Sequence, residues 1–406
     1  MLTSGRADRA RPPSGLPPAQ RCRCVSHNLI AGSDQARRAC FVNIAVDARE
    51  LTAKPTGVGR YLSELLGCWS TSGAATRHEW RFFAHHPPSL PALFDRSVEI
   101  LGGSGGTAWE QWKLPRALTA WQPDVLFAPG YTAPFTAPCP TVLTVHDVSF
   151  FAHPEWFSAR EGWRRRMVTA WSARRAKVVL TVSNFSRNEI VRWVGIPPDR
   201  VRVIRHGMPE RFRRPPNRST REHLILYVGS IFRRRHVDKL LTAFIKTVAD
   251  RVPDSRLEIV GEDRSYPPYD LLQLVKSSSA SIQSRINLRS YVSDEVLDDL
   301  YGRASVFVFL SEYEGFGLPP LEALAAAVPP VVLDTPVARE IYGPAARYVH
   351  LPGGGTDELA GTLIGLLTDD TARQAVLSHA DAVLAGYDWS RAASETLATL
   401  EEAAGA

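Results

Sequence analysis

The chain has 406 residues, 44% of them hydrophobic and 22% charged, and its formal net charge at pH 7 is +6. This length predicts two domains with sizeable cores, and no apolar run reaches the ~18–20 residues of a membrane-spanning helix. The mild positive charge suits phosphate-bearing ligands, anionic lipid surfaces or nucleic acid, and it does not choose among them.

Residues 1–40 are rich in Arg, Pro, Ser and Ala and show neither helical nor strand periodicity. They contain no apolar stretch typical of a secretory signal, although an Arg-rich transit peptide stays open. Cys22 and Cys24 have no partner pair for a metal site, so we expect unpaired thiols in a reducing cytosol. We expect a disordered extension, or a segment that follows a start codon placed too early.

A strand is predicted over residues 41–48, and a helix opens at Gly57-Val58-Gly59. A strand, a glycine-bearing loop and a helix form a phosphate-binding arrangement, because the helix start offers backbone N–H groups. The dinucleotide fingerprint needs a third glycine where this chain has Leu62, so a Rossmann dehydrogenase is not expected. The alternative is a plain tight turn without a ligand.

A second polar cluster lies at the end of the strand predicted over residues 141–148, where His146 precedes Asp147. A single histidine is more often structural than catalytic. A histidine beside an aspartate at the carboxyl end of a parallel strand lies where open α/β sheets bind ligands. We therefore take both residues as candidates for the site.

A helix predicted over residues 161–177 carries Trp163, Met167 and Trp171 four positions apart. We expect an amphipathic helix that packs these side chains inward, with its arginines elsewhere around it. The alternative is a helix whose apolar and basic side chains contact anionic lipid.

A polar, charged and proline-containing segment over residues 211–222 predicts the linker between the two domains. The second domain opens with a strand over residues 224–229. A basic run, Arg233 to Arg235, precedes the helix that follows.

The most informative stretch runs from residue 305 to residue 333 and reads as strand, loop, helix and strand. Its loop contains Glu314-Gly315-Phe316-Gly317, and two prolines fit the first turn of the helix. This loop lies at the carboxyl end of a strand and beside a helix start, where an anion finds backbone N–H groups.

Two glutamates bracket this turn, Glu314 on the loop and Glu322 within the helix. Carboxylates accept hydrogen bonds from sugar hydroxyls, so this pair is suited to holding two sugar rings. The alternative is a pair of solvated surface acids. We favour the site, because the glycines, the prolines and the flanking strands coincide with the pair.

The segment from Glu314 to Glu322 resembles the E-x7-E motif of family four retaining glycosyltransferases. This resemblance implies the GT-B fold, an α/β architecture of two Rossmann-like β/α/β domains that face an interdomain cleft. It also implies that the first glutamate contacts the transferred sugar and the second binds the ribose of the nucleotide. The sequence VLTVHDVSFFAHPEWF is similar to a further family segment, in which His146 or Asp147 reaches the donor sugar.

The resemblance extends over most of residues 41–403, and it implies which further residues bind the donor. The segment YVGSIFRRRHVDKLLTAF is similar to the family's diphosphate-binding element, but Arg234-Arg235-His236 stands where Arg-Lys-Asn is usual. Arginine keeps the positive charge and adds bidentate geometry, although it is not equivalent to lysine. The complete set of implied donor-binding residues is Gly57, Gly59, Ser230, Arg234, Arg235, Val292, Gly315, Phe316, Gly317, Leu318 and Glu322.

Composition predicts an extension over residues 1–40 and a boundary between two domains, 41–215 and 222–385. The resemblance implies that the first binds the acceptor and the second the nucleotide sugar, and that a final helix within 386–406 crosses back to the first domain. It also implies a hexosyltransferase that retains anomeric configuration, and no cofactor is expected. No metal is expected, because the chain contains no Asp-x-Asp. His146, Asp147 and Glu314 are the predicted catalytic residues.

The expected partners are a nucleotide sugar, with GDP-mannose the first candidate, and a glycan or lipid-linked acceptor. A cytoplasmic protein is expected, with peripheral contact at the inner face of the membrane left open. Two other classes also stay open: a catalytically silent GT-B scaffold, and a nucleic-acid-binding protein. No helix-turn-helix, RRM or zinc pattern supports the latter.

Overall fold

The computed structural model describes residues 41–52, 56–209, 221–266 and 270–405. The extension predicted over residues 1–40, and most of the linker predicted over 211–222, lie outside the described residues. Of the described cysteines, neither Cys68 nor Cys139 forms a disulfide.

Two sheets organise the chain, and every strand pair in both is parallel. The first sheet consists of β1 (Asn43–Asp47), β2 (Glu79–Ala84), β3 (Val98–Ile100), β4 (Val125–Ala128), β5 (Thr141–Thr144), β6 (Val178–Thr181) and β7 (Val201–Val203). The second consists of β8 (Leu224–Val228), β9 (Arg256–Val260), β10 (Ile286–Arg289), β11 (Val306–Phe309), β12 (Pro330–Leu333) and β13 (Arg347–Val349).

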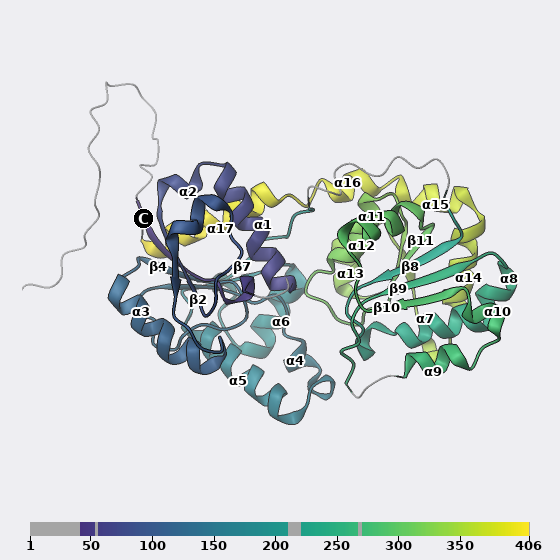
Figure 1. The fold of residues 1–406 in the computed structure, drawn as a ribbon, viewed down its shortest axis with the longest axis horizontal. Helices are drawn as coiled ribbons and strands as arrows, with labels where there is room; N and C mark the ends of the chain where they lie inside the picture. Colours follow the sequence, from purple (N-terminus) through teal and green to yellow (C-terminus); the bar gives the residue numbers. More distant parts are fainter. Residues whose placement is uncertain (1–40, 53–55, 210–220, 267–269, 406) are drawn as a thin grey trace, which may run out of the picture.

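Helices connect the strands in both halves (Figure 1). In the first half these are α1 (Gly57–Thr71), α2 (Ala74–Arg77), α3 (Leu114–Trp121), α4 (Ser149–Ala152), α5 (Ala159–Arg175) and α6 (Asn184–Val194). In the second half they are α7 (Val237–Ala243), α8 (Ala249–Arg251), α9 (Leu271–Lys276), α10 (Ala280–Gln283), α11 (Asp294–Arg303), α12 (Leu318–Ala325), α13 (Pro336–Tyr342), α14 (Asp357–Thr368), α15 (Asp370–Leu377), α16 (Ala380–Leu384) and α17 (Trp389–Ala404).

Short 3-10 and π-helical turns complete the described secondary structure. They are η1 (Arg49–Leu51), η2 (Ala92–Ser97), η3 (Trp109–Lys113), η4 (Pro154–Trp156), η5 (Pro198–Arg200), η7 (Arg233–Arg235), η8 (Phe244–Val248) and η9 (Pro352–Gly354).

Both sheets reverse their strand order once, which fixes where a ligand can bind. The first sheet has the order β3-β2-β1-β4-β5-β6-β7 and the second the order β10-β9-β8-β11-β12-β13. The order reverses between β1 and β4 and between β8 and β11, and ligands of open α/β sheets bind outside the carboxyl ends of the strands at such points. The predicted α/β fold with two Rossmann-like sheets is confirmed.

The final helix α17 belongs to the core of the first half, although it follows the second sheet in sequence (Figure 1). Its buried residues share a hydrophobic cluster with α1 and with the face of the first sheet that carries Ile44 and Val46. The indole Nε1 of Trp69 donates a hydrogen bond to the carbonyl oxygen of Ala393 at 2.9 Å. The chain therefore crosses between the two sheets twice.

The prediction for the 161–177 helix was wrong about which face packs inward. The helix is α5, and its buried positions are the small residues Gly162, Thr169, Ala170, Ser172 and Ala173. Small side chains let the helix backbone lie close to the sheet, and the aromatic stripe is thereby left on the outside.

The strand predicted over residues 141–148 is shorter than expected, since β5 ends at Thr144. His146 and Asp147 consequently lie in the loop beyond the strand. Within the described residues, no helix combines the length and the apolar character that crossing a bilayer requires.

Candidate active site

The candidate site lies where a loop of the second sheet meets the carboxyl end of β5 in the first. Gly315, in the loop between β11 and α12, packs directly on the backbone of His146. A Cβ atom at position 315 would overlap with the carbonyl oxygen of His146 and approach the Asp147 side chain to 3.3 Å. Only glycine permits this approach, so the predicted glycine turn is a point of close backbone contact between the two halves.

Two serines of the first half fix this contact by hydrogen bonds. The hydroxyl of Ser183 donates to the carbonyl oxygen of Gly315 at 2.6 Å. The hydroxyl of Ser186 is placed to donate to the carbonyl oxygens of both His146 and Gly315, at 3.1 and 3.2 Å. All of these groups are buried, and a buried carbonyl without a partner is costly.

The start of α6 is held by an acid from the second half. The Glu340 carboxylate of α13 accepts hydrogen bonds from the backbone N–H groups of Asn184 and Phe185, both at 2.8 Å. A carboxylate at a helix N-terminus also interacts favourably with the helix dipole. The Glu340 carboxylate therefore occupies the place at this helix N-terminus where an anionic ligand could otherwise bind.

Asp147 is held rigidly by its neighbours. Its Oδ2 accepts a hydrogen bond from the Tyr131 hydroxyl at 2.9 Å, and its Oδ1 accepts one from the backbone N–H of Ser149 at 2.8 Å. Tyr131 itself has a φ of 62°, in the left-handed region that few tyrosines adopt. Backbone strain of this kind persists only where the surroundings enforce it.

His146 is nearly buried, with 9% of its surface exposed. Its Nε2 lies 3.0 Å from the carbonyl oxygen of Pro129, which can only accept, so Nε2 carries the proton. Burial lowers the pKa of His146 below its usual value of 6.5. The ring is therefore a neutral imidazole at pH 7, with Nδ1 as its acceptor nitrogen.

Glu314 forms a partly buried ion pair with Arg235. The Nη2 of Arg235 lies 2.7 Å from Oε1 of Glu314, and the two side chains are 13% and 17% exposed. Burial is the largest influence and lowers the pKa of Arg235, but the charge and hydrogen bond of Glu314 together with those of Tyr227 outweigh it, so that pKa is raised. Neither group is a solvated surface charge, and the positive charge of Arg235 is already compensated.

Arg234 differs from Arg235 in its surroundings, which are aromatic rings instead of a carboxylate. Its Nε is buried and has no hydrogen-bond partner within the described part of the chain. The guanidinium carbon lies 4.2 Å from the ring centroid of Phe232 and 5.5 Å from that of Trp156, which comes from the first half. Arg234 is thus a cation at the interface with hydrogen-bonding capacity to spare.

Glu322 is only 5% exposed, and its Oε2 accepts a hydrogen bond from the Tyr301 hydroxyl at 3.2 Å. Like Glu314, it is not a solvated surface acid. Tyr301 is itself buried against Phe307 of β11. The Glu322 carboxylate is therefore held by a side chain that packs on the second sheet.

The predicted phosphate-binding turn at the start of α1 has a structural role at one of its glycines. The N–H of Gly59 donates to the Thr56 hydroxyl at 3.0 Å, and a Cβ there would lie 2.7 Å from the carbonyl oxygen of Glu50. At Gly57, by contrast, a Cβ would meet no described atom within 4 Å. Of the two, Gly57 therefore leaves its backbone open to a ligand.

Three further predicted donor residues lie on or next to the loop that carries Glu314. Gly317 has a φ of 85°, and its carbonyl accepts a hydrogen bond from the Tyr342 hydroxyl at 2.8 Å. Phe316 is 5% exposed, and Leu318, which begins α12, is half-buried. These residues shape the loop and close it against the core of the second half.

The last two predicted donor residues follow other strands of the second sheet. Ser230 follows β8, and its carbonyl accepts hydrogen bonds from the Tyr227 hydroxyl and from Arg235. Val292 follows β10 and packs against the core of the second half. Ser230 is thereby tied to the ion pair of Arg235 and Glu314, whereas Val292 contributes apolar packing.

His206 was not selected from the sequence, yet it lies at the centre of this interface. It packs against Phe316 at 5.0 Å, Trp389 at 5.2 Å and Tyr61 at 5.1 Å between ring centroids. Neither of its ring nitrogens has a hydrogen-bond partner among the described residues. Its only signal in the sequence was its place after the last strand of the first sheet, next to Gly207.

Two other features of the described residues bear on the chemistry. They contain no group of three or more His, Cys, Asp or Glu side chains placed to hold a metal ion. Surface cavities of about 350 and 430 Å³ lie elsewhere, one beside β2 and β3 and one beside Arg221 and Arg303. Neither is lined by residues of the candidate site.

Family models match both halves of the chain. Residues 209–381 match the family described as glycosyl transferases group 1, and residues 55–211 match the family described as glycosyltransferase family 4. The two matched segments adjoin, and both sides of the candidate site lie within them.

Three curated proteins are similar to the chain at modest identity. It is 29% identical over 266 residues to O-antigen chain mannosyltransferase B of Escherichia coli, across 63% of this chain and 68% of that protein. It is 26% identical over 283 residues to an MMP alpha-(1->4)-mannosyltransferase of Mycolicibacterium hassiacum, across 65% and 66%. It is 29% identical over 214 residues to O-antigen chain mannosyltransferase RfbU of Salmonella typhimurium, across 51% and 56%.

Solved structures share the fold over most of the chain. HepE of Anabaena, solved with UDP and glucose, superposes with a TM-score of 0.68 at 18% identity, across 89% of this chain and 100% of that one. WaaG, a glycosyltransferase involved in lipopolysaccharide biosynthesis, superposes with a TM-score of 0.67 at 17% identity, across 88% and 99%. The predicted GT-B architecture is confirmed by these likenesses.

The burial of His206 predicts how stability depends on pH. Burial, together with the neighbouring His146, holds the pKa of His206 well below 6.5. The unfolded chain binds a proton here below about pH 6.5 and the folded chain does not, so stability is present above that pH and falls below it, by up to about 1.4 kcal/mol per pH unit. His206→Phe should flatten the decline of the melting temperature from about pH 6.5 to about pH 5.

The matched control is His379→Phe, which removes an imidazole from the exposed surface. Melting curves of the three proteins across this pH range provide the comparison. If His206→Phe and the unchanged protein lose stability in parallel, the buried neutral imidazole is not the cause.

Proposed function

Because the chain belongs to the family 4 glycosyltransferases, we propose that it transfers a hexose from a nucleoside diphosphate sugar to a hydroxyl group of a glycan or lipid-linked acceptor. The observation that carries this proposal is the contact of the Glu314–Gly317 loop with His146 and Asp147. It places carboxylates, an imidazole and an uncompensated arginine at the carboxyl ends of two facing sheets. That set matches a sugar joined to a diphosphate.

The leaving group of this reaction is a nucleoside diphosphate, so the site must stabilise developing negative charge. Arg234 is the proposed partner of the diphosphate, since its Nε lacks a hydrogen bond within the described residues. The backbone at Gly57, at the start of α1, is the proposed second source of positive potential. Preorganised donors of this kind act strongly where water is excluded.

The two glutamates have separate proposed roles. Glu314 and its partner Arg235 would orient the transferred sugar, because the ion pair fixes the carboxylate in the contact region. Glu322 would accept hydrogen bonds from the ribose. His146 and Asp147 would contact the sugar from the first half, with Asp147 kept in place by Tyr131.

We further propose that the anomeric configuration is retained and that no metal ion takes part. The bond from the anomeric carbon to the diphosphate breaks and the acceptor oxygen attacks from the same face. The proton of the acceptor hydroxyl passes to the departing phosphate oxygen, so no protein nucleophile is needed. The positive charge of Arg234 takes the electrostatic role that a divalent cation has in other transferases.

Mannose is the proposed hexose, with GDP-mannose as donor, because several similar proteins are named mannosyltransferases. GDP-mannose should raise the melting temperature more than UDP-glucose does, since a ligand that binds only the folded state stabilises it by about 2.7 kcal/mol at a hundredfold excess over its Kd. A larger rise in melting temperature with another nucleotide sugar would indicate that this other sugar nucleotide is the donor. A donor that binds but is never turned over would indicate a silent scaffold.

Arg234→Ala should weaken the binding of GDP by roughly 1.5–3 kcal/mol and leave the binding of guanosine unchanged, because a charge-assisted bond to phosphate is lost. Isothermal titration calorimetry measures both affinities. The matched control is Arg233→Ala, which alters the adjacent and more exposed arginine. Equal losses for the two variants, or equal losses for GDP and guanosine, would remove Arg234 from the diphosphate site.

Donor turnover should persist in the presence of EDTA, and NMR of the product should show the anomeric configuration of the donor. The first expectation rests on arginine and helix ends as the charges that face the diphosphate. Turnover that is abolished by EDTA and restored by magnesium or manganese would refute metal independence. An inverted product would refute the proposed same-face substitution.

A further inference from the structure

The outward face of α5 exposes large apolar side chains in a regular stripe. Trp163, Met167 and Trp171 are 62%, 44% and 45% exposed, and they recur every four residues. Isolated apolar side chains are common on protein surfaces, but a stripe of them along one helix needs a reason. The opposite face holds only small buried residues, so this orientation is determined by packing and the stripe cannot turn inward.

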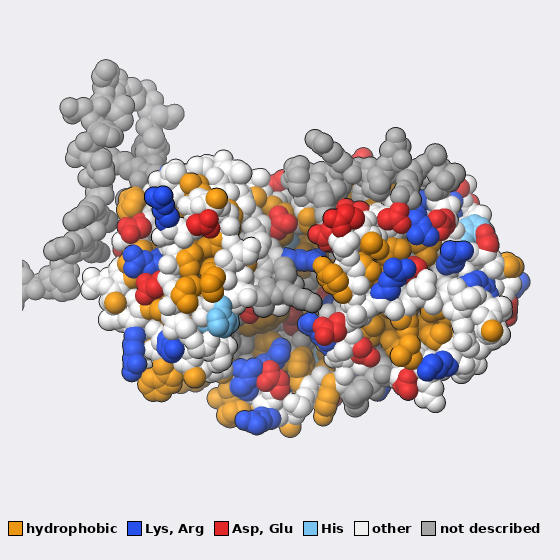
Figure 2. All heavy atoms as spheres, in the orientation of Figure 1, with side chains coloured by type: hydrophobic (Ala, Val, Ile, Leu, Met, Phe, Trp, Pro, Cys, Tyr) orange, Lys and Arg blue, Asp and Glu red, His pale blue; other side chains and the backbone are white. Residues whose placement is uncertain are grey.

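Positive charge surrounds the stripe. Within α5 the arginines Arg160, Arg164, Arg165 and Arg175 are exposed, and Glu161 is the helix's single acid. Arg175 lies over the Trp171 ring, with 5.6 Å from the guanidinium carbon to the ring centroid. Figure 2 shows apolar and basic side chains, with acidic ones among them, along this edge of the first half, where α5 lies in Figure 1.

A neighbouring turn adds to the same surface. The ring of Trp171 packs against that of Phe135 at 5.0 Å between centroids. The backbone N–H of Phe135 donates to the side chain of Gln111 in η3 at 2.9 Å. We call the outer face of α5 together with Phe135 the α5 surface.

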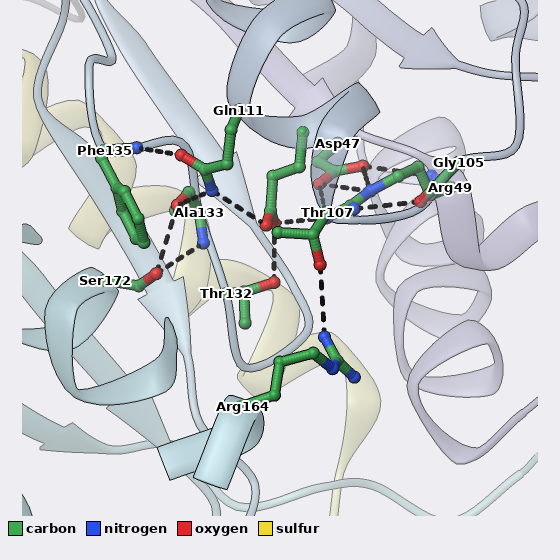
Figure 3. Close-up of polar contacts among 11 residues, drawn as sticks. Asp47, Arg49, Gly105, Thr107, Gln111, Thr132, Ala133, Phe135, Arg164 and Ser172 are labelled. Carbon is green, nitrogen blue, oxygen red and sulfur yellow. Dashed lines mark hydrogen bonds and ion pairs between the residues drawn. The ribbon is translucent and has the colours of Figure 1, made fainter. Parts of the chain in front are cut away.

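A polar network beneath the α5 surface holds its parts in place (Figure 3). The hydroxyl of Ser172 in α5 is paired with both the N–H and the carbonyl of Ala133, at 3.0 and 3.1 Å. The side chain of Gln111 donates to the same carbonyl at 3.3 Å. Helix α5, the loop and η3 are therefore joined through one backbone position.

The network continues to a buried ion cluster at the end of β1. The Nη2 of Arg49 lies 2.5 Å from Glu110 and 2.7 Å from Asp47, and the Glu110 carboxylate also accepts a hydrogen bond from Thr132 at 2.6 Å (Figure 3). Burial opposes the charge of Arg49, but the two carboxylates outweigh it and raise its pKa. The α5 surface is thus a prearranged face and not a set of loose side chains.

We propose that the α5 surface docks the protein on a bilayer that carries anionic lipid. Tryptophan has an apolar ring with one polar N–H and is suited to the boundary between head groups and acyl chains. Arginine can keep its charged end at the phosphates while its methylene chain covers apolar surface. A helix that lies in the plane of the interface combines these two features, and attraction to anionic lipid adds to the burial of apolar area.

This proposal goes beyond the transfer reaction and does not depend on it. Charge indicates which partner binds the α5 surface. The exposed arginines outnumber the single acid of α5, and a bilayer of anionic lipid offers phosphates across the whole of this surface. Glu161 pairs with Arg164 and Arg165 and offsets one of these charges, so the helix keeps a net positive face. A protein partner would have to supply acidic groups in register with the remaining charge, whereas lipid head groups rearrange to meet it.

Cosedimentation of the full chain with vesicles tests the proposal. The protein should bind vesicles containing about 30% phosphatidylglycerol and bind pure phosphatidylcholine far more weakly. The double variant with Trp163→Ser and Trp171→Ser should bind the anionic vesicles at least about tenfold less, because two large apolar side chains no longer enter the interface. Salt at about 0.5 M should also weaken binding by screening the arginines.

The control is Leu272→Ser, which removes a 60% exposed apolar side chain from α9 of the second half and should leave vesicle binding unchanged. If the double variant does not fold, as judged by its melting curve, the single variant Trp163→Ser replaces it with the same expected direction. Equal binding by the variants and the unchanged protein overturns the proposal, as does no binding to anionic vesicles. A change of oligomeric state in the double variant without vesicle binding would assign the α5 surface to a second copy of the chain and likewise overturn it.

Discussion

The close approach of Gly315 to the backbone of His146 is the constraint on which the rest of the site depends. At this point two parallel sheets with separate cores meet, and the space between them admits no side chain at position 315. The carbonyl groups buried there would be costly without partners, and Ser183 and Ser186 supply them. The two serines lie at the start of α6, and Gly315 lies just before α12. The contact therefore sets the position of these two helix N-termini relative to each other.

The distribution of charge at this contact separates two arginines that the sequence presents as equals. Arg235 is neutralised by Glu314, and a partly buried ion pair of this kind contributes more to orientation than to stability, since each charge has given up much of its water. Arg234 retains unmet hydrogen-bonding capacity and lies between aromatic rings of both halves. This arrangement fixes one carboxylate in place and leaves one cation with a donor to offer.

The first half also contains polar groups that hold one another in place. Arg49, Asp47 and Glu110 satisfy one another beneath the surface, and Tyr131 satisfies Asp147 at the site. These interactions rigidify the loops that follow β1 and β4. The outward aromatic stripe of α5 is a consequence of the same packing, because the small residues of the helix are required against the sheet.

The sequence by itself determined the two-sheet fold, the succession of strands and helices, and the loop that carries Glu314 and Glu322. These follow from local patterns: short apolar runs for buried parallel strands, glycines at tight turns and prolines in a first helical turn. The position of His146 and Asp147 at the carboxyl end of a strand also followed, although β5 ends at Thr144 and leaves both residues in the loop. The family resemblance rested on these same segments.

Only the tertiary structure decided which residues meet. The pairing of Arg235 with Glu314, the support of Asp147 by Tyr131 and the burial of His206 join segments that are separated in the sequence, and no local pattern encodes such contacts. The face of α5 was misjudged for a related reason. Spacing shows that Trp163, Met167 and Trp171 share a face, but whether that face or the one with the small residues packs inward depends on how closely the helix must approach the sheet.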